Sequence, residues 1–212
     1  MKEDAISDRR GIIRSAPVPL PIPIPPSVMG WMFAEELAWL YGAALGAKNR
    51  GVKGGVLEIG CYEGLATCAL AQTGTVECVD TWLGGTDRMP THDSFPAFRA
   101  NLEGVGLFDR VAAIRGSSRD VLPRLRAEGR RYRLILVDGD HSYEAAKADL
   151  EDSWAMLSYG GVLVADDMFV DDAAGVGFKG VRQACQELGG FALLGAGKLG
   201  FKIKDPTVLE MR

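Results

Sequence analysis

The chain lacks several features that would place it in other classes of protein. No uninterrupted apolar run approaches the roughly 20 residues that cross a bilayer, so we expect a soluble protein with no membrane partner. A net charge of −4 and a sequence pI of about 5.3 leave no basic excess for binding nucleic acid. The four cysteines form no C-x-x-C pair and no zinc spacing, which predicts buried free thiols and a cytoplasmic location.

The glycine pattern of nicotinamide-dependent enzymes is also missing. The stretch "VLEIGCYEGLAT" spaces Gly60 and Gly64 as G-x-x-x-G rather than G-x-G-x-x-G, and no third glycine is present to cradle a pyrophosphate. Glu58, just before this turn, would repel a pyrophosphate but suits a cationic ligand. The sequence therefore disfavours a hydride-transfer enzyme.

What the chain does contain is a regular alternation of short apolar runs and amphipathic stretches after residue 55. The patterns predict strands at 55–60, 75–80, 110–116, 133–138 and 160–167, with helices between them and a closing hairpin at 190–204. This rhythm is typical of an α/β protein with a Rossmann-like, doubly wound sheet. We expect seven mostly parallel strands, a C-terminal antiparallel hairpin, and a single main domain over residues 51–212.

Residues 1–50 form a predicted N-terminal extension. Alternating prolines at 17–27 favour an extended, polyproline-like strap, and the apolar spacing at 30–47 predicts a helix. We expect this extension to contact the substrate or to mediate assembly into a homo-oligomer. Trp31 and Trp39 are candidates to border a pocket.

Polar residues follow the predicted strands at the edge where α/β sheets bind ligands. Asp80 ends the second strand, where a carboxylate can accept both hydroxyls of a ribose. Ser118 and Arg119 follow the third strand and are placed to reach the edge of a nucleobase. Together with Glu58, they predict a nucleoside site.

The fourth and fifth strands end in carboxylates. Asp138 ends one, and Asp166 and Asp167 end the other. If these strands are neighbours, three carboxylates converge, and close carboxylates need a cation or a proton between them. Hard oxygen ligands suit Mg²⁺. The alternative is that Asp138–Gly139 is an ordinary turn and Asp166–Asp167 a helix cap.

The motifs "VLEIGCYEG", "VDTWLGG", "IRGSS", "VDGDHSYE" and "GGVLVADD", in this order, resemble those of class I S-adenosylmethionine-dependent O-methyltransferases. The resemblance covers residues 55 to about 204 and is strongest to the metal-dependent subgroup related to macrocin O-methyltransferase; catechol O-methyltransferase is more distant. It implies that Glu58, Gly60 and Gly64 line the methionine part of the donor, that Asp80 holds the ribose, and that Trp82 and Ser118 lie near the adenine. Tyr62 and Asp138 complete the expected cofactor-binding set.

The resemblance also implies a metal site and a base. Asp138, Asp166 and Asp167 would hold Mg²⁺ or Mn²⁺, and His141 would remove the proton from the acceptor hydroxyl. Asp140 is the alternative base, or else a cap for the helix that follows. The expected acceptor is a hydroxyl of a small molecule, on a sugar or natural-product scaffold, contacted by the N-terminal helix and by residues 81–94 and 168–178.

Two other functions stay open at this point. One is a hydroxylase-like tailoring enzyme on the same fold. The other is a non-catalytic protein that binds S-adenosylmethionine.

Overall fold

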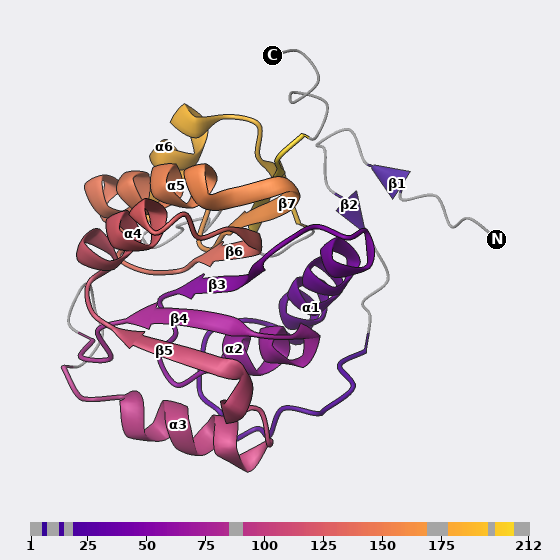
Figure 1. The fold of residues 1–212 in the computed structure, drawn as a ribbon, viewed down its shortest axis with the longest axis vertical. Helices are drawn as coiled ribbons and strands as arrows, with labels where there is room; N and C mark the ends of the chain where they lie inside the picture. The colour runs from indigo at the N-terminus through magenta and orange to yellow at the C-terminus, as the bar shows by residue number, and fades with distance from the viewer. Residues whose placement is uncertain are drawn as a thin grey trace.

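The computed structural model describes residues 6–7, 13–14, 19–84, 91–168, 178–194 and 198–205. A seven-stranded sheet forms the centre (Figure 1), in the order β5-β4-β3-β6-β7-β9-β8. Its strands are β3 (Gly55–Ile59), β4 (Val76–Asp80), β5 (Val111–Arg115), β6 (Tyr132–Val137), β7 (Leu157–Ala165), β8 (Ala192–Leu193) and β9 (Gly200–Ile203). A separate short pair joins β1 (Ile6–Ser7) to β2 (Ile13–Arg14).

The strand directions confirm the predicted fold. β5, β4, β3, β6 and β7 are parallel, whereas β9 runs antiparallel between β7 and β8. The order reverses between β3 and β6, so their carboxyl ends form a topological switch point. Ligands bind outside the strands at such a point in open α/β sheets.

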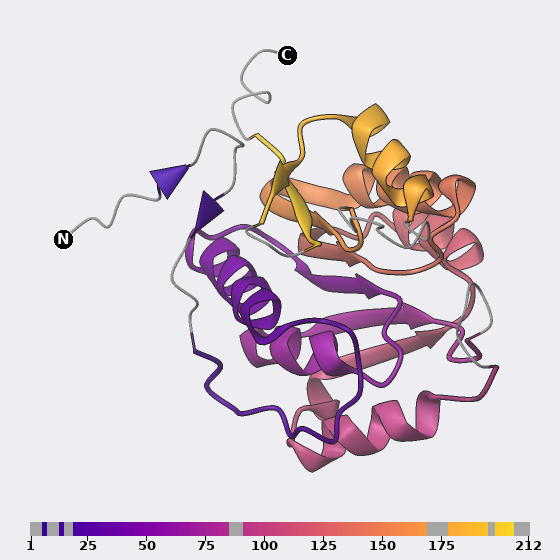
Figure 2. The ribbon, with the colours of Figure 1, turned by 180° about the vertical axis from the view of Figure 1, so that it is seen from behind.

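Helices cover both faces of the sheet (Figures 1 and 2). One layer contains α1 (Ala34–Asn49), α2 (Leu65–Leu70) and α3 (Phe95–Gly104); the other contains α4 (Ser118–Ala127), α5 (Tyr143–Met156) and α6 (Lys179–Leu188). Short 3₁₀ turns follow at Ala71–Thr73 and Phe108–Arg110.

Two hydrophobic cores result from the two-residue period of the strands. On β6, Leu134 and Leu136 pack into the core under α1 and α2, while Ile135 and Val137 pack into the core under α4, α5 and α6. The apolar runs of β3 and β6 are continuous because these central parallel strands are buried on both faces.

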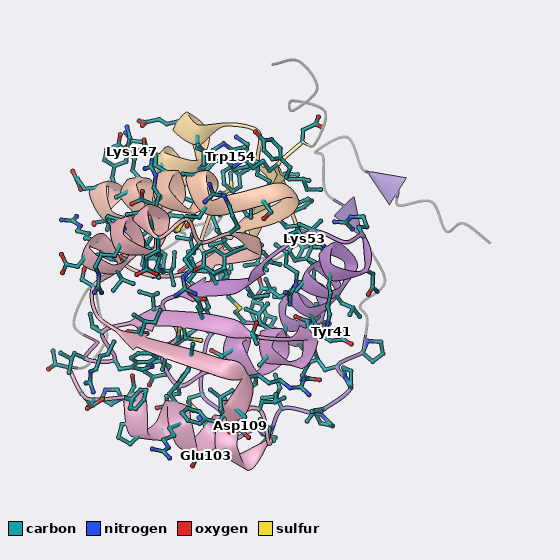
Figure 3. All side chains as sticks on the ribbon, in the orientation of Figure 1. Tyr41, Lys53, Glu103, Asp109, Lys147 and Trp154 are labelled. Atoms are coloured by element: carbon teal, nitrogen blue, oxygen red, sulfur yellow. The ribbon has the colours of Figure 1, made fainter. Side chains whose placement is uncertain are left out.

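The C-terminal strand β9 is fixed to α5. Trp154 of α5, labelled in Figure 3, has its ring centroid 4.3 Å from Lys202 Nζ and 5.3 Å from Lys204 Nζ. Lys204 Nζ also donates to the carbonyl groups of Trp154 and Leu157 at the end of the helix, where a cation is favourable.

The N-terminal strap packs across the body of the protein. Leu20, Ile22 and Ile24 pack against the core, and the residues between them are exposed. The side-chain amide of Gln72 accepts from Ile22 N at 2.7 Å and donates to Ile22 O at 2.9 Å.

The helix predicted at 30–47 begins later, at Ala34. Glu36 explains this start, because its carboxylate accepts a hydrogen bond from Phe33 N at 2.8 Å and so caps the first turn. Residues 30–33 therefore lie outside the helix.

None of the helices in the described ranges is long and apolar enough to cross a membrane. The four cysteines are buried and free, as the sequence predicts.

Candidate active site

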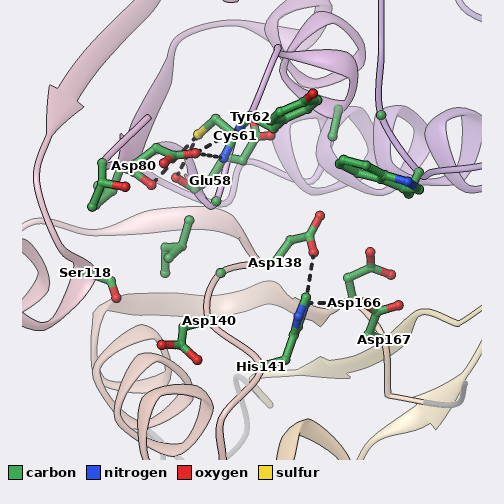
Figure 4. Close-up of a pocket in the computed structure, with 18 of the residues that line it drawn as sticks. Glu58, Cys61, Tyr62, Asp80, Ser118, Asp138, Asp140, His141, Asp166 and Asp167 are labelled. Atoms are coloured by element: carbon green, nitrogen blue, oxygen red, sulfur yellow. Dashed lines mark hydrogen bonds and ion pairs between the residues drawn. The ribbon is translucent and has the colours of Figure 1, made fainter. Parts of the chain in front are cut away.

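A cavity of about 840 Å³ lies at the carboxyl ends of the parallel strands. It is lined by the turn after β3, the ends of β4 and β7, the start of α4, the loop after β6, and the N-terminal segment 29–33. Figure 4 shows Glu58, Tyr62 and Asp80 on one side of this space and Asp138, His141 and Asp167 on the other. The volume is at the upper end of the range for ligand pockets, roughly 300–1,000 Å³.

Glu58 is a buried carboxyl group with an altered pKa. It is the second-last residue of β3, is 1% exposed and lines the cavity. Burial raises the pKa of the Glu58 carboxyl from 4.5 to about 8, and a hydrogen bond to Thr67 acts in the opposite direction. A cationic ligand in the cavity would favour the ionised form.

Asp80 organises the turn after β3. Its Oδ2 accepts from Cys61 N at 2.7 Å and from Tyr62 N at 2.9 Å, and its Oδ1 accepts from Trp82 N at 2.7 Å. A carboxylate offers about four lone-pair positions, so the backbone already takes most of this capacity. Asp80 lines the cavity, but the structure gives it a structural role that its strand-end position alone did not predict.

Gly60 is required by close packing of two loops. Its φ is +83°, and an added Cβ would lie 1.9 Å from the carbonyl oxygen of Asp138. The glycine thus lets the turn after β3 meet the loop after β6, which brings the nucleoside side of the cavity against the acidic side.

Backbone strain is concentrated around this cavity. In the described ranges, the non-glycine residues with positive φ are Tyr62 (+47°), Trp82 (+53°) and Asp167 (+54°), and each follows the end of a strand, β3, β4 or β7. Such conformations are uncommon, especially for bulky residues, and they cluster at functional sites.

Two residues predicted for the cofactor site do not line the cavity. Trp82 is completely buried, with its ring 4.9 Å from that of Phe95 and 5.0 Å from that of Phe98. This corrects the expectation that Trp82 lies beside the adenine. Gly64 instead begins α2 with a φ of +89°, behind the cavity wall and facing Phe98. Ser118 and Arg119 do line the cavity, beside Asp140.

The ends of β6 and β7 bring predicted residues together. His141 Nε2 lies 3.2 Å from Asp167 Oδ2 and 3.8 Å from Asp138 Oδ1 (Figure 4). Candidate ligand atoms of these three residues all lie within 4.8 Å of one another. Burial, together with the charge of Asp166, raises the pKa of Asp138 to about 7.

Lys198 contacts the other carboxylates of this group. Its Nζ lies 2.5 Å from Asp166 Oδ2 and 3.1 Å from Asp167 Oδ1. Burial raises the pKa of both aspartates, and the charge of Lys198 opposes that rise. Burial alone would lower the pKa of Lys198, but the three aspartates raise it above its usual range. Asp166 Oδ1 is buried and has no hydrogen-bond partner among the described residues.

Asp140 lies apart from this group. Its Oδ1 accepts a hydrogen bond from Ser142 N at 2.8 Å, which closes a turn just before α5; the N-cap of this helix is Ser142 and not Asp140. Figure 4 places its carboxylate on the side of Ser118, away from Asp166 and Asp167. Asp140 still lines the cavity.

Lys198 lines the cavity and was not predicted. It precedes β9 by two positions and carries no motif, so only the insertion of β9 beside β7 brings it to the aspartates. Phe178, the last residue of the expected acceptor segment 168–178, lines the cavity and packs against His141, with ring centroids 4.0 Å apart. Trp31 was a candidate and lines the cavity, whereas Trp39 packs against Phe201 in the core region.

Parts of the expected acceptor region lie outside the described residues. These are residues 85–90 of the loop at 81–94, and residues 169–177, which include Asp171 and Asp172. His92 is described and exposed, with its ring edge-on to Tyr62 at 6.0 Å.

Comparison with known proteins agrees with this geometry. Residues 57–168, just over half of the chain, match the family described as "Methyltransferase domain". The chain belongs to this methyltransferase family, which confirms the class expected from the motifs.

Solved structures share the fold. The O-methyltransferase from Bacillus cereus, in complex with SAH, has 20% identity and a TM-score of 0.59, covering 83% of this chain and 81% of its own. TomG from Streptomyces achromogenes, in complex with SAM, has 18% identity and a TM-score of 0.61, covering 85% and 83%. The O-methyltransferase NovP has 17% identity and a TM-score of 0.64, covering 80% and 79%.

Proposed function

We propose that the protein transfers a methyl group from S-adenosylmethionine to a hydroxyl group of a small molecule, and that it requires a divalent metal, Mg²⁺ or Mn²⁺. One observation carries this proposal. A single cavity joins the buried carboxyl of Glu58 to an acidic cluster, defined as Asp138, Asp166 and Asp167. The donor is supported by two structural neighbours solved with SAM or SAH.

The nucleoside side of the cavity suits this donor. Glu58 would face the cationic methionine part, the remaining lone-pair position of Asp80 would accept from the ribose, and the Ser118 hydroxyl would lie near the base. Gly60 and Tyr62 would contribute backbone to the same wall. When bound, S-adenosylmethionine supplies the methyl group from its positively charged sulfonium. The sulfur becomes a neutral thioether in the product, S-adenosylhomocysteine.

The acidic cluster fits a divalent cation. Asp138 and Asp167 have ligand atoms within 4.8 Å of each other and of His141. Oδ1 of buried Asp166 has no hydrogen-bond partner among the described residues, and a buried polar atom normally has one. Carboxylate oxygens suit Mg²⁺ and Mn²⁺. A bound divalent ion would lower the pKa of an acceptor hydroxyl.

His141 is the proposed base. Its Nε2 faces Asp138 and Asp167, so a proton taken from the acceptor hydroxyl would be held there beside two carboxylates. Asp140 is the weaker candidate, because its carboxylate already accepts from Ser142 N. The remaining task of the chain is to hold the acceptor oxygen in line with the methyl carbon.

An iron-dependent hydroxylase is less consistent with this cavity. Such enzymes commonly use two histidines and a carboxylate, and His141 is the one histidine among the described residues that line the space.

The test is label transfer from methyl-labelled S-adenosylmethionine to a panel of sugars, phenols and polyketide alcohols, with Mg²⁺ or with EDTA. We expect transfer that EDTA abolishes and that His141→Ala reduces more than Asp140→Asn. Transfer unaffected by EDTA would reject the metal, and absence of donor binding would reject the methyl transfer.

A further inference from the structure

Large apolar side chains are exposed at the mouth of the cavity. Met29, Trp31 and Phe33 are 58%, 61% and 63% exposed, and all three line the cavity. They occupy alternate positions of the non-helical segment 29–33. Single exposed apolar residues are ordinary, but a group at the entrance of a pocket marks a ligand-binding surface.

The segment is held firmly against the body. Val28 is buried, and Gly30 approaches α2 so closely that an added Cβ would lie 2.7 Å from the side chain of Leu65. Glu36 accepts from Phe33 N at 2.8 Å through Oε2 and from Lys198 N at 3.1 Å through Oε1. One buried carboxylate therefore ties the apolar segment to the residue that contacts Asp166 and Asp167.

Tyr62 extends this surface into the cavity. Its ring centroid lies 5.0 Å from that of Trp31, with the planes tilted by 42°. We call Met29, Trp31, Phe33 and Tyr62 the aromatic rim.

The charges of the lining residues disfavour an acceptor with a diphosphate. Apart from His141, the described cationic residues of the lining are Arg119 and Lys198. Arg119 adjoins Ser118 on the nucleoside side, and Lys198 is paired with Asp166 and Asp167. A nucleotide-linked sugar would thus bring its negative charges to an acidic cavity with an apolar mouth.

We infer that the acceptor has a flat aromatic body that packs on the aromatic rim, and that it presents a phenolic hydroxyl to the acidic cluster. Trp31 and Phe33 determine this specificity. This inference rests on the proposed function and narrows its acceptor class. Aromatic side chains bury a large area and favour offset or edge-on partners. A phenol, with a pKa of about 10, also yields its proton more readily than a sugar hydroxyl.

The test is calorimetry on protein loaded with S-adenosylhomocysteine and Mg²⁺. Three probes are titrated: catechol, 2,3-dihydroxynaphthalene and thymidine diphosphate rhamnose. We expect the naphthalene diol to bind about tenfold more tightly than catechol, and the diphosphate sugar to bind most weakly. In Trp31→Ala and Phe33→Ala, the affinity ratio of the two diols should fall towards one. Because both diols meet the same variant, this ratio cancels any general change in the site.

Tyr159→Ala is the matched control, because Tyr159 is exposed at 40% but does not line the cavity. It should keep the wild-type ratio. Tighter binding of the diphosphate sugar, absence of diol binding, or an unchanged ratio in Trp31→Ala would overturn the inference. So would a dimer of the wild type that Trp31→Ala dissociates in sedimentation, because a second copy would then cover the aromatic rim. Failure of S-adenosylhomocysteine to bind would instead reject the proposed function.

Discussion

The two halves of the cavity are assembled in different ways. The nucleoside half takes Glu58 and Asp80 from the ends of β3 and β4, and Ser118 from the start of α4, just after β5; these three strands are adjacent. The acceptor half gathers segments 29–33, 138–141, 166–167 and residue 198 from nearly the whole length of the chain. Residues at strand ends can be predicted from the sequence, whereas residues from distant segments are brought together only by the fold.

The halves also differ in how they manage negative charge. Glu58 is buried with no ion pair to any described residue, and burial raises its pKa to about 8. The acidic cluster is partly balanced by Lys198, whose Nζ lies 2.5 Å from Asp166 Oδ2 and 3.1 Å from Asp167 Oδ1. The arrangement at Glu58 favours a cationic ligand. In the acidic cluster, the single charge of Lys198 neutralises part of the negative charge, which favours binding of a divalent cation there.

The largest effect should come from removing Lys198. Asp166 is 2% exposed, and breaking one partner of a buried pair costs about 3–5 kcal/mol. Lys198→Met should therefore lower the free energy of unfolding by roughly that amount in metal-free protein, measured by urea unfolding. Mg²⁺ should stabilise this variant more than the wild type, because the divalent ion supplies the missing positive charge.

Two further variants sharpen that measurement. Lys198→Arg should recover most of the stability, since it keeps the positive charge. Lys53→Met replaces an exposed lysine and should change stability by less than about 0.5 kcal/mol. An unchanged stability of Lys198→Met would mean that the acidic cluster needs no internal cation, and the contrast between the halves would be lost.

The acidic cluster itself should be separable from donor binding. In Asp166→Asn/Asp167→Asn, both side chains keep their size but lose their charge. We expect kcat/KM to fall by about 100-fold, or about 2.7 kcal/mol, at fixed Mg²⁺. The affinity for S-adenosylhomocysteine should change by less than about threefold, because its proposed contacts lie in the other half.

The control for this pair is Asp152→Asn, which removes a charge from α5 outside the cavity lining. It should retain wild-type activity. Equal losses of donor affinity and of kcat/KM in the double variant would show that the two halves are not independent.

Much of the nucleoside half could be predicted from sequence, and the errors have physical causes. The strands, their order-reversing topology and the carboxylates at their ends follow from periodicity and motif order. Trp82 was expected near the adenine, but its backbone has a positive φ and its ring is buried against Phe95 and Phe98. The sequence "VDTW" does not indicate this backbone conformation. Asp80 accepts from three backbone amide groups, which the sequence did not indicate, and its contact with the ribose stays a prediction.

In the acceptor half, the aspartates and the histidine could be predicted from the sequence, but their surroundings could not. Asp138, His141 and Asp167 were predicted and do meet, because they end neighbouring strands. Lys198 could not be predicted, since its position depends on the antiparallel insertion of β9 beside β7. Residues 30–33 were assigned to a helix because apolar spacing cannot show that Glu36 caps its first turn at Phe33.

The pH dependence of stability should also contain a contribution from Glu58. Its pKa is 4.5 as the reference value and about 8 in the folded protein, so the folded state retains a proton that the unfolded state releases. The stabilisation is fully present below pH 4.5 and is lost as the pH rises towards 8, by up to about 1.4 kcal/mol per pH unit. Glu58→Gln should remove this slope in ligand-free protein.

Binding of the cationic donor should reverse the protonation of Glu58. We expect nearly one proton to be released per S-adenosylmethionine bound near pH 7, measured by calorimetry in two buffers of different ionisation enthalpy. Glu58→Gln should release none. Equal proton release by both proteins would place the proton source elsewhere.

The most direct test of the central claim is diffraction at the manganese absorption edge from crystals grown with Mn²⁺ and S-adenosylhomocysteine. The claim is that the acidic cluster holds a divalent ion beside the bound donor. It predicts an anomalous peak roughly 2.0–2.2 Å from carboxylate oxygens of Asp138, Asp166 and Asp167. It would be contradicted by crystals in which the donor product is bound, no peak lies at these oxygens, and Lys198 alone neutralises them.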